Sequence, residues 1–532
     1  MNFKKLILAL SLLIAVHTSK AQDLFDVSLV PTTITDLPGA HSFAFGKWDG
    51  KWIIIGGRLN GLHGFQPPFG FPFNSANSQI YIIDPDFQQV WDTTTSNLSQ
   101  ELIDHVSSSA FEFVQRDSML YIMGGYGYNT NLNSFITFPN LTAVNLSSLV
   151  NAVINQGDIS PSFRQLTDSN LLVAGGHAAW MDSTCYLVFG HRFDGRYDKQ
   201  DTTGFFVQEY THQIRMFQIN DDGVNLSLSN YATLTDTANF RRRDYNLIPQ
   251  IFPDGSSGLT AFSGVFRENM NLPYFHPVNI HAGTYEVDTV FNQYLNHYDS
   301  GVMPIYDANF NAMHNVFFGG MAMYTYDTLT NTYPVDSLIP FVKTISRVTR
   351  WANGAVSEIK LPVEMPSLQG TNALFIPDPA IPLINNEIIN LNLLPSGSVR
   401  AGFLLGGIES PLNNISDIDP SLTWAVSTLY EVYINKQSST GLTSLGNEKI
   451  SAQLTPNPAS SETQLEIHFA HSGFLHAELR DITGRVIKVI CHKKIGEGGH
   501  VFRIDLADLA PGMYAVNCEL DGNYTSLKLI KD

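Results

Sequence analysis

The chain has 532 residues and a formal net charge of −18, from 31 Lys and Arg against 49 Asp and Glu. An acidic chain disfavours binding to a phosphate backbone, which needs clustered cations, and the basic run at 241–243 is followed at once by Asp244. We therefore expect no nucleic-acid partner. Hydrophobic residues make up 44% of the chain, enough for a sizeable core in one large radial domain or two ordinary ones.

The N-terminus has the pattern of an export signal. Lys4 and Lys5 precede an apolar run, and Ser19 and Ala21 place small residues where signal peptidase cleaves. The run is too short to span a bilayer, which takes about 20 residues, and no later segment is long and apolar enough. We expect residues 1–21 to be a signal peptide, no transmembrane segment, and export through the periplasm.

One phrase, an apolar strand that ends in two glycines, recurs along residues 22–435. It reads WIIIGG at 52–57, LYIMGG at 120–125, VFFGG at 316–320 and FLLGG at 403–407, and echoes with one glycine end at 190 and 264. A β-carbon there would collide with a neighbouring sheet or require an unfavourable φ, and no helix follows that would suit a phosphate site. The glycines that we assign to this packing role are Gly56, Gly57, Gly124, Gly125, Gly190, Gly264, Gly319, Gly320, Gly406 and Gly407.

Each phrase follows another apolar strand and a short turn, and the first repeat adds two strands within residues 79–92. A repeat of four strands is typical of a propeller blade. The apolar strand, Gly-Gly and closing aromatic residue resemble the kelch repeat, which implies an all-β, kelch-like β-propeller. We predict six blades, or seven if one is concealed within residues 193–240, and pairing of the strand at 24–30 with strands near 424–434 to close the ring.

The C-terminus, after a polar linker at 436–449, carries LTPNPAS at 454–460, LRDITGRVI at 479–487, DLADLAPGMYAVNC at 505–518 and SLKLIKD at 526–532. These motifs resemble the type A sorting domain of the type IX secretion system of Bacteroidota. The resemblance implies a small β-sandwich over residues 450–532, recognition by the secretion machinery, and a secreted or outer-membrane surface protein; an ordinary adhesive β-domain is the alternative. The motif residues are Pro456, Asn457, Pro458, Asp481, Gly484, Arg485, Gly512, Tyr514 and Lys528.

Ligands of propellers favour the mouth of the central channel and the loops on one face. Charged or histidine-bearing segments at 190–198 and 239–246, and histidines near inner strands, therefore supply candidates. Arg243 could hold a carboxylate or a sugar acid through two hydrogen bonds, and the alternative is a structural pair with Asp244 that braces adjacent blades. The candidate ligand-binding residues are His41, His191, Arg192, Arg243, Asp244 and His297.

No catalytic pattern is apparent: the sequence lacks a nucleophile elbow, paired carboxylates at catalytic spacing and a zinc-binding helix. Kelch-like propellers include copper radical oxidases that resemble galactose oxidase, which need a Cys–Tyr crosslink, a second Tyr and two His. Here Cys185 adjoins Tyr186 within one strand, on opposite faces, so that set is not assembled. We predict no metal and no cofactor. Cys491 and Cys518 could form a disulfide after export, which their spacing does not decide.

Two main functions remain open. The leading hypothesis is a non-catalytic module that binds a glycan or a protein. The rival is a carbohydrate-active enzyme, either an oxidase like galactose oxidase or a lyase or hydrolase, with its site at the channel mouth; a purely structural adhesin is a third. Convergence of His, Tyr, Arg and carboxylate groups from three or more blades favours the enzyme, and an open aromatic face favours binding.

Overall fold

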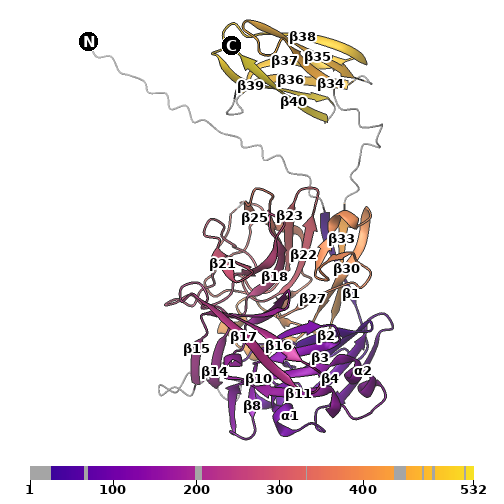
Figure 1. Ribbon diagram of the computed structural model, residues 1–532, viewed down its shortest axis with the longest axis vertical. Helices are drawn as coiled ribbons and strands as arrows, with labels where there is room; N and C mark the ends of the chain where they lie inside the picture. The colour runs from indigo at the N-terminus through magenta and orange to yellow at the C-terminus, as the bar shows by residue number, and fades with distance from the viewer. Residues whose placement is uncertain are drawn as a thin grey trace, which may run out of the picture. The chain divides into compact units, whose positions relative to one another are not determined.

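The computed structural model describes residues 25–64, 70–197, 206–330, 332–436, 451–469, 473–481, 486–520 and 523–532. The chain folds into two compact units, residues 1–437 and 438–532. Figure 1 shows that strands build nearly all of both units. The predicted signal peptide, residues 1–21, and residues 437–449 of the predicted linker lie outside the described residues.

Among its described residues, the first unit contains six sheets that each include four successive antiparallel strands, which we number as blades 1 to 6. Blade 1 contains β2 (Ala44–Trp48), β3 (Lys51–Ile55), β4 (Gln79–Asp84) and β5 (Gln89–Thr94). Blade 2 contains β6 (Glu112–Arg116), β7 (Met119–Met123), β10 (Asn140–Asn145) and β11 (Phe163–Thr167). Blade 3 contains β12 (His177–Met181), β13 (Thr184–Val188), β16 (Gln213–Asp221) and β17 (Leu226–Thr235). Blade 4 contains β18 (Asn246–Ile251), β19 (Ser257–Phe262), β20 (Val278–His281) and β21 (Thr284–Val287). Blade 5 contains β22 (Gly301–Asp307), β23 (Ala312–Phe318), β24 (Thr344–Arg350) and β25 (Val356–Glu364). Blade 6 contains β27 (Leu374–Pro377), β30 (Gly397–Leu405), β33 (Leu429–Lys436) and β1 (Phe25–Thr32).

Smaller elements decorate these blades. Two hairpins are β8 (Tyr126–Asn129) with β9 (Ser134–Thr137) and β14 (His191–Gly195) with β15 (Phe206–Tyr210). A three-stranded sheet contains β26 (Leu368–Thr371), β31 (Ile408–Ser410) and β32 (Trp424–Ala425). Strands β28 (Leu383–Ile384) and β29 (Ile388–Asn390) extend the sheet of blade 5. The helices are α1 (Gln100–Val106) and α2 (Leu146–Ile154), with 3₁₀ turns η1 (Phe73–Ser75), η2 (Ser160–Ser162), η3 (Ser169–Leu171), η4 (Leu391–Leu393), η5 (Ile415–Asp417) and η6 (Pro420–Leu422).

The glycine phrases connect each blade to the next. In each blade the amide of one phrase glycine donates to a backbone carbonyl oxygen at 2.8–3.2 Å. The pairs are Gly57 to Ser108, Gly125 to Val173, Gly190 to Arg242, Gly264 to His297, Gly320 to Gln369 and Gly407 to Ala40. Each acceptor lies just ahead of the following blade, and the acceptor for blade 6 lies ahead of blade 1. The six sheets therefore form a closed ring, which is the architecture of a propeller.

Gly56 shows why this phrase requires glycine. Its φ is +65°, and a β-carbon would lie 2.6 Å from the carbonyl oxygen of Val106 and 2.7 Å from the ring of Phe111. Both conditions penalise any larger residue, because a left-handed backbone costs an L-residue about 1–2 kcal/mol before any clash is counted.

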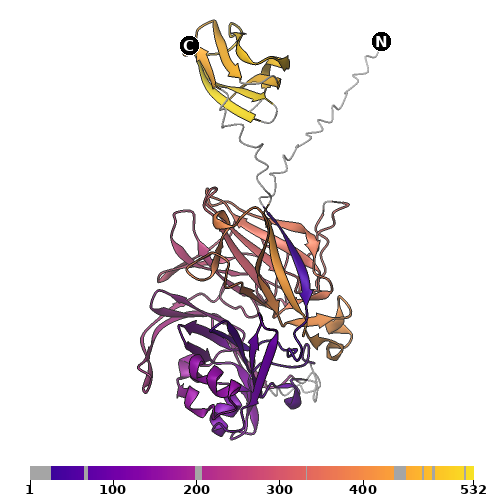
Figure 2. The same ribbon diagram turned by 90° about the vertical axis from the view of Figure 1, so that its right-hand side faces the viewer.

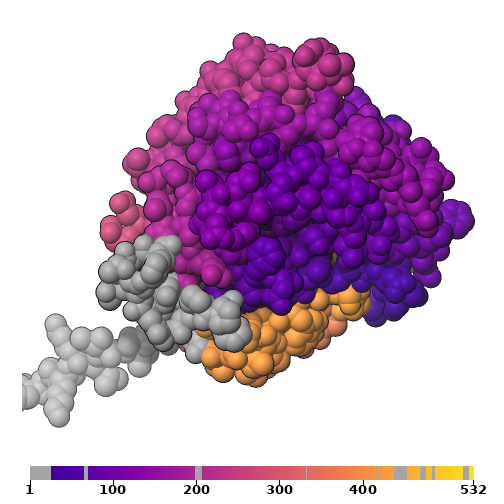
Figure 3. All heavy atoms as spheres, turned by 90° about the horizontal axis from the view of Figure 1, so that it is seen from below, coloured from indigo at the N-terminus to yellow at the C-terminus, as the bar shows by residue number. Residues whose placement is uncertain are grey.

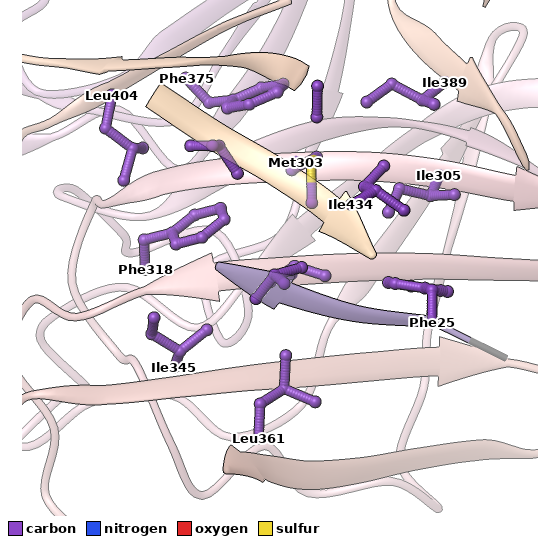
Figure 4. Close-up of a cluster of buried hydrophobic side chains, with 14 of the residues drawn as sticks. Phe25, Met303, Ile305, Phe318, Ile345, Leu361, Phe375, Ile389, Leu404 and Ile434 are labelled. Carbon is purple, nitrogen blue, oxygen red and sulfur yellow. The ribbon is translucent and has the colours of Figure 1, made fainter. Parts of the chain in front are cut away.

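Six apolar layers fill the spaces between successive blades, including the space between blade 6 and blade 1. Figure 4 shows the layer between blades 5 and 6, where Met303, Phe318 and Ile345 of blade 5 face Phe375 and Leu404 of blade 6. Burying each such side chain contributes about 1.5–3 kcal/mol. The core is thus a set of wedges around an axis, and it explains why strands buried on both faces read as continuous apolar runs.

The closing strand comes from the other end of the unit. β1 pairs antiparallel with β33, from Phe25 opposite Lys436 to Thr32 opposite Leu429, which confirms the predicted closure. Figure 2 shows the indigo strand beside the orange ones, and Figure 3 shows indigo and orange segments in contact on one face. Residues 206–235, where the sequence left room for another blade, instead supply β15 and the two outer strands of blade 3.

The second unit is a small β-sandwich of two sheets. One contains β34 (Ser451–Thr455), β35 (Glu462–Phe469) and β38 (Gly498–Asp505), and the other contains β37 (Val486–Ile495), β36 (Gly473–Asp481), β39 (Gly512–Leu520) and β40 (Asn523–Lys531). The two sheets enclose one apolar core that includes Leu465, Leu479 and Val516.

The described motif residues of the predicted sorting domain lie in β36, β39 and β40 and in the segment between β34 and β35. The Asn457 amide donates to the carbonyl oxygen of Lys528 at 2.6 Å and accepts from the Ile530 amide at 2.9 Å. The Tyr514 hydroxyl donates to a backbone carbonyl at 2.8 Å. Two of the motif residues, Gly484 and Arg485, lie outside the described residues.

Cys491 and Cys518 are buried free thiols on two strands of this sandwich that flank β36. Both cysteines lie opposite Ala477 of β36, one on each side of it. An intervening strand separates their backbones by about 9–10 Å, beyond the reach of a disulfide, whose Cα atoms lie at most about 7 Å apart.

Candidate functional site

A chain of backbone hydrogen bonds surrounds the propeller axis. It runs through the residue that stands two positions ahead of the first strand in every blade: Ser42, Ala110, Gly175, Asp244, Asp299 and Asn372. From Ala110 onward, each amide donates to the carbonyl oxygen of the residue in the preceding blade, at 2.8–3.1 Å. Consequently Asp244 and Asp299, which are far apart in the sequence, become neighbours at the axis.

A pocket of about 870 Å³ opens at this ring, and all six ring residues line it. We call it the axial pocket. Its lining comes from all six blades and from the hairpins β8–β9 and β14–β15. A cavity of this size suits a small ligand of one or a few sugar rings, since small-molecule sites span about 300–1,000 Å³.

Three arginines line the axial pocket: Arg58, Arg241 and Arg243. In the run at 241–243 alternate side chains face opposite ways, as in a strand. Arg242 is fully buried and donates to three backbone carbonyl oxygens at 2.6–3.0 Å. The structural role in this run therefore belongs to Arg242, and its two neighbours supply cations to the pocket.

Two side chains contact the Arg243 guanidinium. Its Nη1 lies 3.2 Å from Nδ1 of His191. Its Nε is buried and lies 3.3 Å from Oδ2 of Asp244 as an ion pair, although this contact lacks the geometry of a hydrogen bond. A guanidinium that lines a pocket is suited to a carboxylate or a phosphate.

Arg58 immediately follows the Gly-Gly of blade 1. Its Nε donates to Oδ1 of Asn60 at 3.1 Å and its Nη2 to the carbonyl oxygen of Pro72 at 3.0 Å, so the side chain is held in place. Burial lowers the pKa of Arg58 to about 10, which still leaves it charged at neutral pH. The guanidinium lies 5.6 Å from the centre of the Phe71 ring.

Aromatic rings form one wall of the axial pocket. His63 stacks on Phe71 and Tyr197, with ring centres 4.1 and 5.2 Å away. Tyr126 lies 4.8 Å from Phe71, and Phe193 lies 4.8 Å from Tyr197. Such a wall offers apolar faces and hydroxyl edges, the combination that packs against a sugar ring and hydrogen-bonds its hydroxyl groups.

The histidines of this pocket are neutral at physiological pH. Burial, with the Arg58 charge second, lowers the pKa of His41 to about 3, and burial lowers that of His63 to about 4. Burial and then Arg243 and Arg241 hold the His191 pKa well below its usual value. These rings therefore act as hydrogen-bonding groups, and Nε2 of His41 has no partner among the described residues.

Three carboxyl groups line the same pocket. Burial and the neighbouring Asp244 raise the pKa of Asp299 well above its usual value, and Oδ1 of Asp299 lies 3.8 Å from Nε2 of His177. Burial raises the pKa of Asp244 as well, against the pull of Arg243. Burial raises that of Glu112 to about 8, although Oε1 accepts from the Gly176 amide at 2.7 Å. Raised values favour the protonated forms, so this part of the pocket can donate protons as well as accept them.

Four of the six residues proposed from the sequence come together here: His41, His191, Arg243 and Asp244. Arg192 does not line the pocket, because its side chain turns to Asp194, with Nε 2.7 Å from Oδ2. His297 is fully buried: Nε2 donates to the Gln293 carbonyl and Nδ1 accepts from a backbone amide.

Sequence reasoning passed over most of this pocket, including Arg58, Glu112 and Asp299. One signal was available. The residue after the last glycine of each phrase lines the pocket in five of the six blades: Arg58, Tyr126, His191, Met321 and Ile408. The residue two positions ahead of the first strand of each blade also lines the pocket, in all six blades.

The copper site of galactose-oxidase-like enzymes does not fit these residues. Cys185, the thiol nearest a tyrosine in sequence, is fully buried between blades 2 and 3 and does not line the axial pocket. The described ranges contain no group of three or more His, Cys, Asp or Glu side chains placed to hold a metal ion.

The class of the second unit follows from comparison with known families. Residues 453–532 match the family model described as the secretion system C-terminal sorting domain. This type IX sorting module indicates that the protein is exported and then secreted or attached to the cell surface. Among the described residues, no helix is long and apolar enough to cross a membrane.

Two solved structures show a distant similarity to this chain. One is a fungal alcohol oxidase of the AA5 family in complex with copper, at 9% identity and a TM-score of 0.38, covering 96% of this chain and 100% of that one. The other is YjhT, at 10% identity and a TM-score of 0.40, covering 70% of this chain and 93% of that one. No curated protein matches the sequence. Conclusions about ligands therefore depend on this chain's own residues.

Proposed function

We propose that this exported propeller binds an acidic carbohydrate in its axial pocket. The observation that carries the proposal is the convergence of Arg58, Arg241 and Arg243 in one cavity beside a wall of aromatic rings. Guanidinium groups pair with a sugar carboxylate, and the rings pack against its apolar face. The sorting domain implies interaction with the secretion machinery, and type IX export from a member of the Bacteroidota is the route that we propose.

The test compares charged and neutral sugars on the full-length chain. Isothermal titration with galacturonate and glucuronate oligomers, against their neutral counterparts, should show binding of the acidic set. Arg243→Gln removes charge-assisted hydrogen bonds worth about 1.5–3 kcal/mol, so affinity should fall by roughly 10- to 150-fold.

Arg192→Gln is the matched control, because Arg192 lies on β14 beside the pocket but pairs with Asp194 instead. Its affinity should equal that of the unaltered protein. Equal binding of acidic and neutral oligomers, or equal losses in the two variants, would contradict the proposal.

A second candidate is an enzyme that acts on the same acidic sugar by proton transfer. It is favoured by the adjacent Asp244 and Asp299, whose pKa values are both raised, and by His177 at 3.8 Å from Asp299. A raised pKa favours the protonated form of a carboxyl group, which can act as a general acid. Incubation of the acidic oligomers with the protein, followed by proton NMR, should then show conversion that Asp299→Asn abolishes while binding persists; unchanged spectra favour the binding protein.

A further inference from the structure

A second cavity, of about 860 Å³, lies on the outer part of the propeller between blades 4 and 5. Its lining includes residues of β20 and β21 on one side and the turn between β24 and β25 on the other. Figure 1 shows β21 and β25 on the same side of this unit. The cavity shares no lining residue with the axial pocket, and we call it the lateral groove.

Aromatic rings line the lateral groove. Phe252 is buried at 5% exposure, and its ring is tilted by 39° against that of His281, with ring centres 4.3 Å apart. Tyr294 and Tyr333 lie 5.3 Å apart at an angle of 36°, and Tyr333 is 37% exposed. An exposed ring on an open groove favours a ligand with flat apolar faces, which sugar rings possess.

The floor of the groove presents a buried cation with an unused donor. Arg350 is only 8% exposed, and its Nη2 donates to Oδ1 of Asn279 at 2.7 Å. Its Nε has no hydrogen-bond partner among the described residues. Leaving such a group unpaired costs about 1–3 kcal/mol in general, so an acceptor that reached it would stabilise the site.

Carboxyl groups line the opposite side and exclude an anion. Glu286 is exposed, and Asp288 holds its own loop by accepting from the amides of Val290 and Phe291 at 3.1 Å each. Glu358 accepts from the Tyr294 amide at 2.7 Å, which fixes one aromatic platform to blade 5. Burial raises the pKa of Glu358 to about 8, against the hydrogen bonds from the Tyr294 and Leu295 amides, which lower it.

We infer that the lateral groove binds a neutral oligosaccharide, with a sugar ring on Tyr333 and hydroxyl groups bonded to Arg350 and the carboxyl rim. Hydroxyl groups both donate and accept, which suits a site that offers an unfilled N–H beside several carboxylates. Glu286 and Asp288 repel an acidic chain, which distinguishes this groove from the cationic axial pocket. This inference does not depend on the function proposed for that pocket.

The experiment screens neutral xylo-, manno-, gluco- and galacto-oligosaccharides of three to six units against the full-length chain. Titration calorimetry should find one binding event, and hydrogen–deuterium exchange should show protection within 286–294 and 350–358 when the sugar is bound. Tyr333→Ala removes an exposed ring without opening the core, and it should weaken binding at least tenfold.

Two controls give the result its meaning. Tyr231→Ala removes another partly exposed tyrosine, 43% exposed on β17, and Arg243→Gln alters the axial pocket; both should bind the neutral oligosaccharide as before. Absence of binding to every neutral oligosaccharide at millimolar concentration overturns the inference. Binding that survives Tyr333→Ala, or protection that falls elsewhere, including at the axial pocket, also overturns it.

Discussion

Glu112 offers the sharpest test of the electrostatics of the axial pocket. It begins β6, its side chain is 1% exposed, and Oε1 accepts the amide of Gly176 in the adjacent blade at 2.7 Å. The other oxygen, Oε2, has no partner among the described residues. Glu112→Gln keeps the acceptor for Gly176 and removes the proton equilibrium, so it isolates the effect of the buried acid.

The direction in which the free energy of unfolding changes with pH follows from the raised pKa of Glu112, about 8 in the folded state against an ordinary value of 4.5. Between these two pH values the unfolded chain releases this proton while the folded chain keeps it, so unfolding becomes easier as pH rises. At 1.36 kcal/mol per unit, the contribution of Glu112 to the free energy of unfolding falls by about 4 kcal/mol from pH 5 to pH 9.

The assay is urea unfolding of the unaltered protein and of Glu112→Gln at several pH values, with a probe that reports on the propeller. The variant should gain stability relative to the unaltered protein by that amount across the range. Glu101→Gln, at an exposed position in α1, is the control and should show no such trend. A difference between protein and variant that stays constant with pH would refute the reasoning.

Two further predictions concern packing. Gly319→Ala should lower the free energy of unfolding by more than about 2 kcal/mol, because the φ of Gly319 is +65° and the added carbon would lie 2.1 Å from the carbonyl oxygen of Gln369. Thermal unfolding measures the change, and an unchanged midpoint would contradict this contact between blades. Cys491 and Cys518 should both react with a thiol reagent after denaturation without reductant, since β36 separates them, and a mass that shows a disulfide between them would disprove the strand order.

Local sequence determined the blades because the constraint that produces them is local. A strand that ends where two wedges meet takes a left-handed turn, and in four of the six blades two glycines make it, as at Gly56 and Gly57, while Phe189 and Ser263 stand at the first position in blades 3 and 4. The closing pair β1 and β33 was also predictable, since a ring leaves no strand edge unpaired. The sorting domain could be predicted from the sequence because each of its motifs is a short, contiguous stretch of residues.

The axial pocket was decided by tertiary structure. Asp244 and Asp299 influence each other because blades 4 and 5 bring their backbones within a hydrogen bond of 3.0 Å, a proximity that no sequence spacing encodes. The alternation that sends Arg242 into the core and Arg243 to the pocket depends on the phase of a strand relative to the axis. Charge and residue type were visible in the sequence, but burial and neighbours, which set the chemistry of each group, arise only when the ring closes.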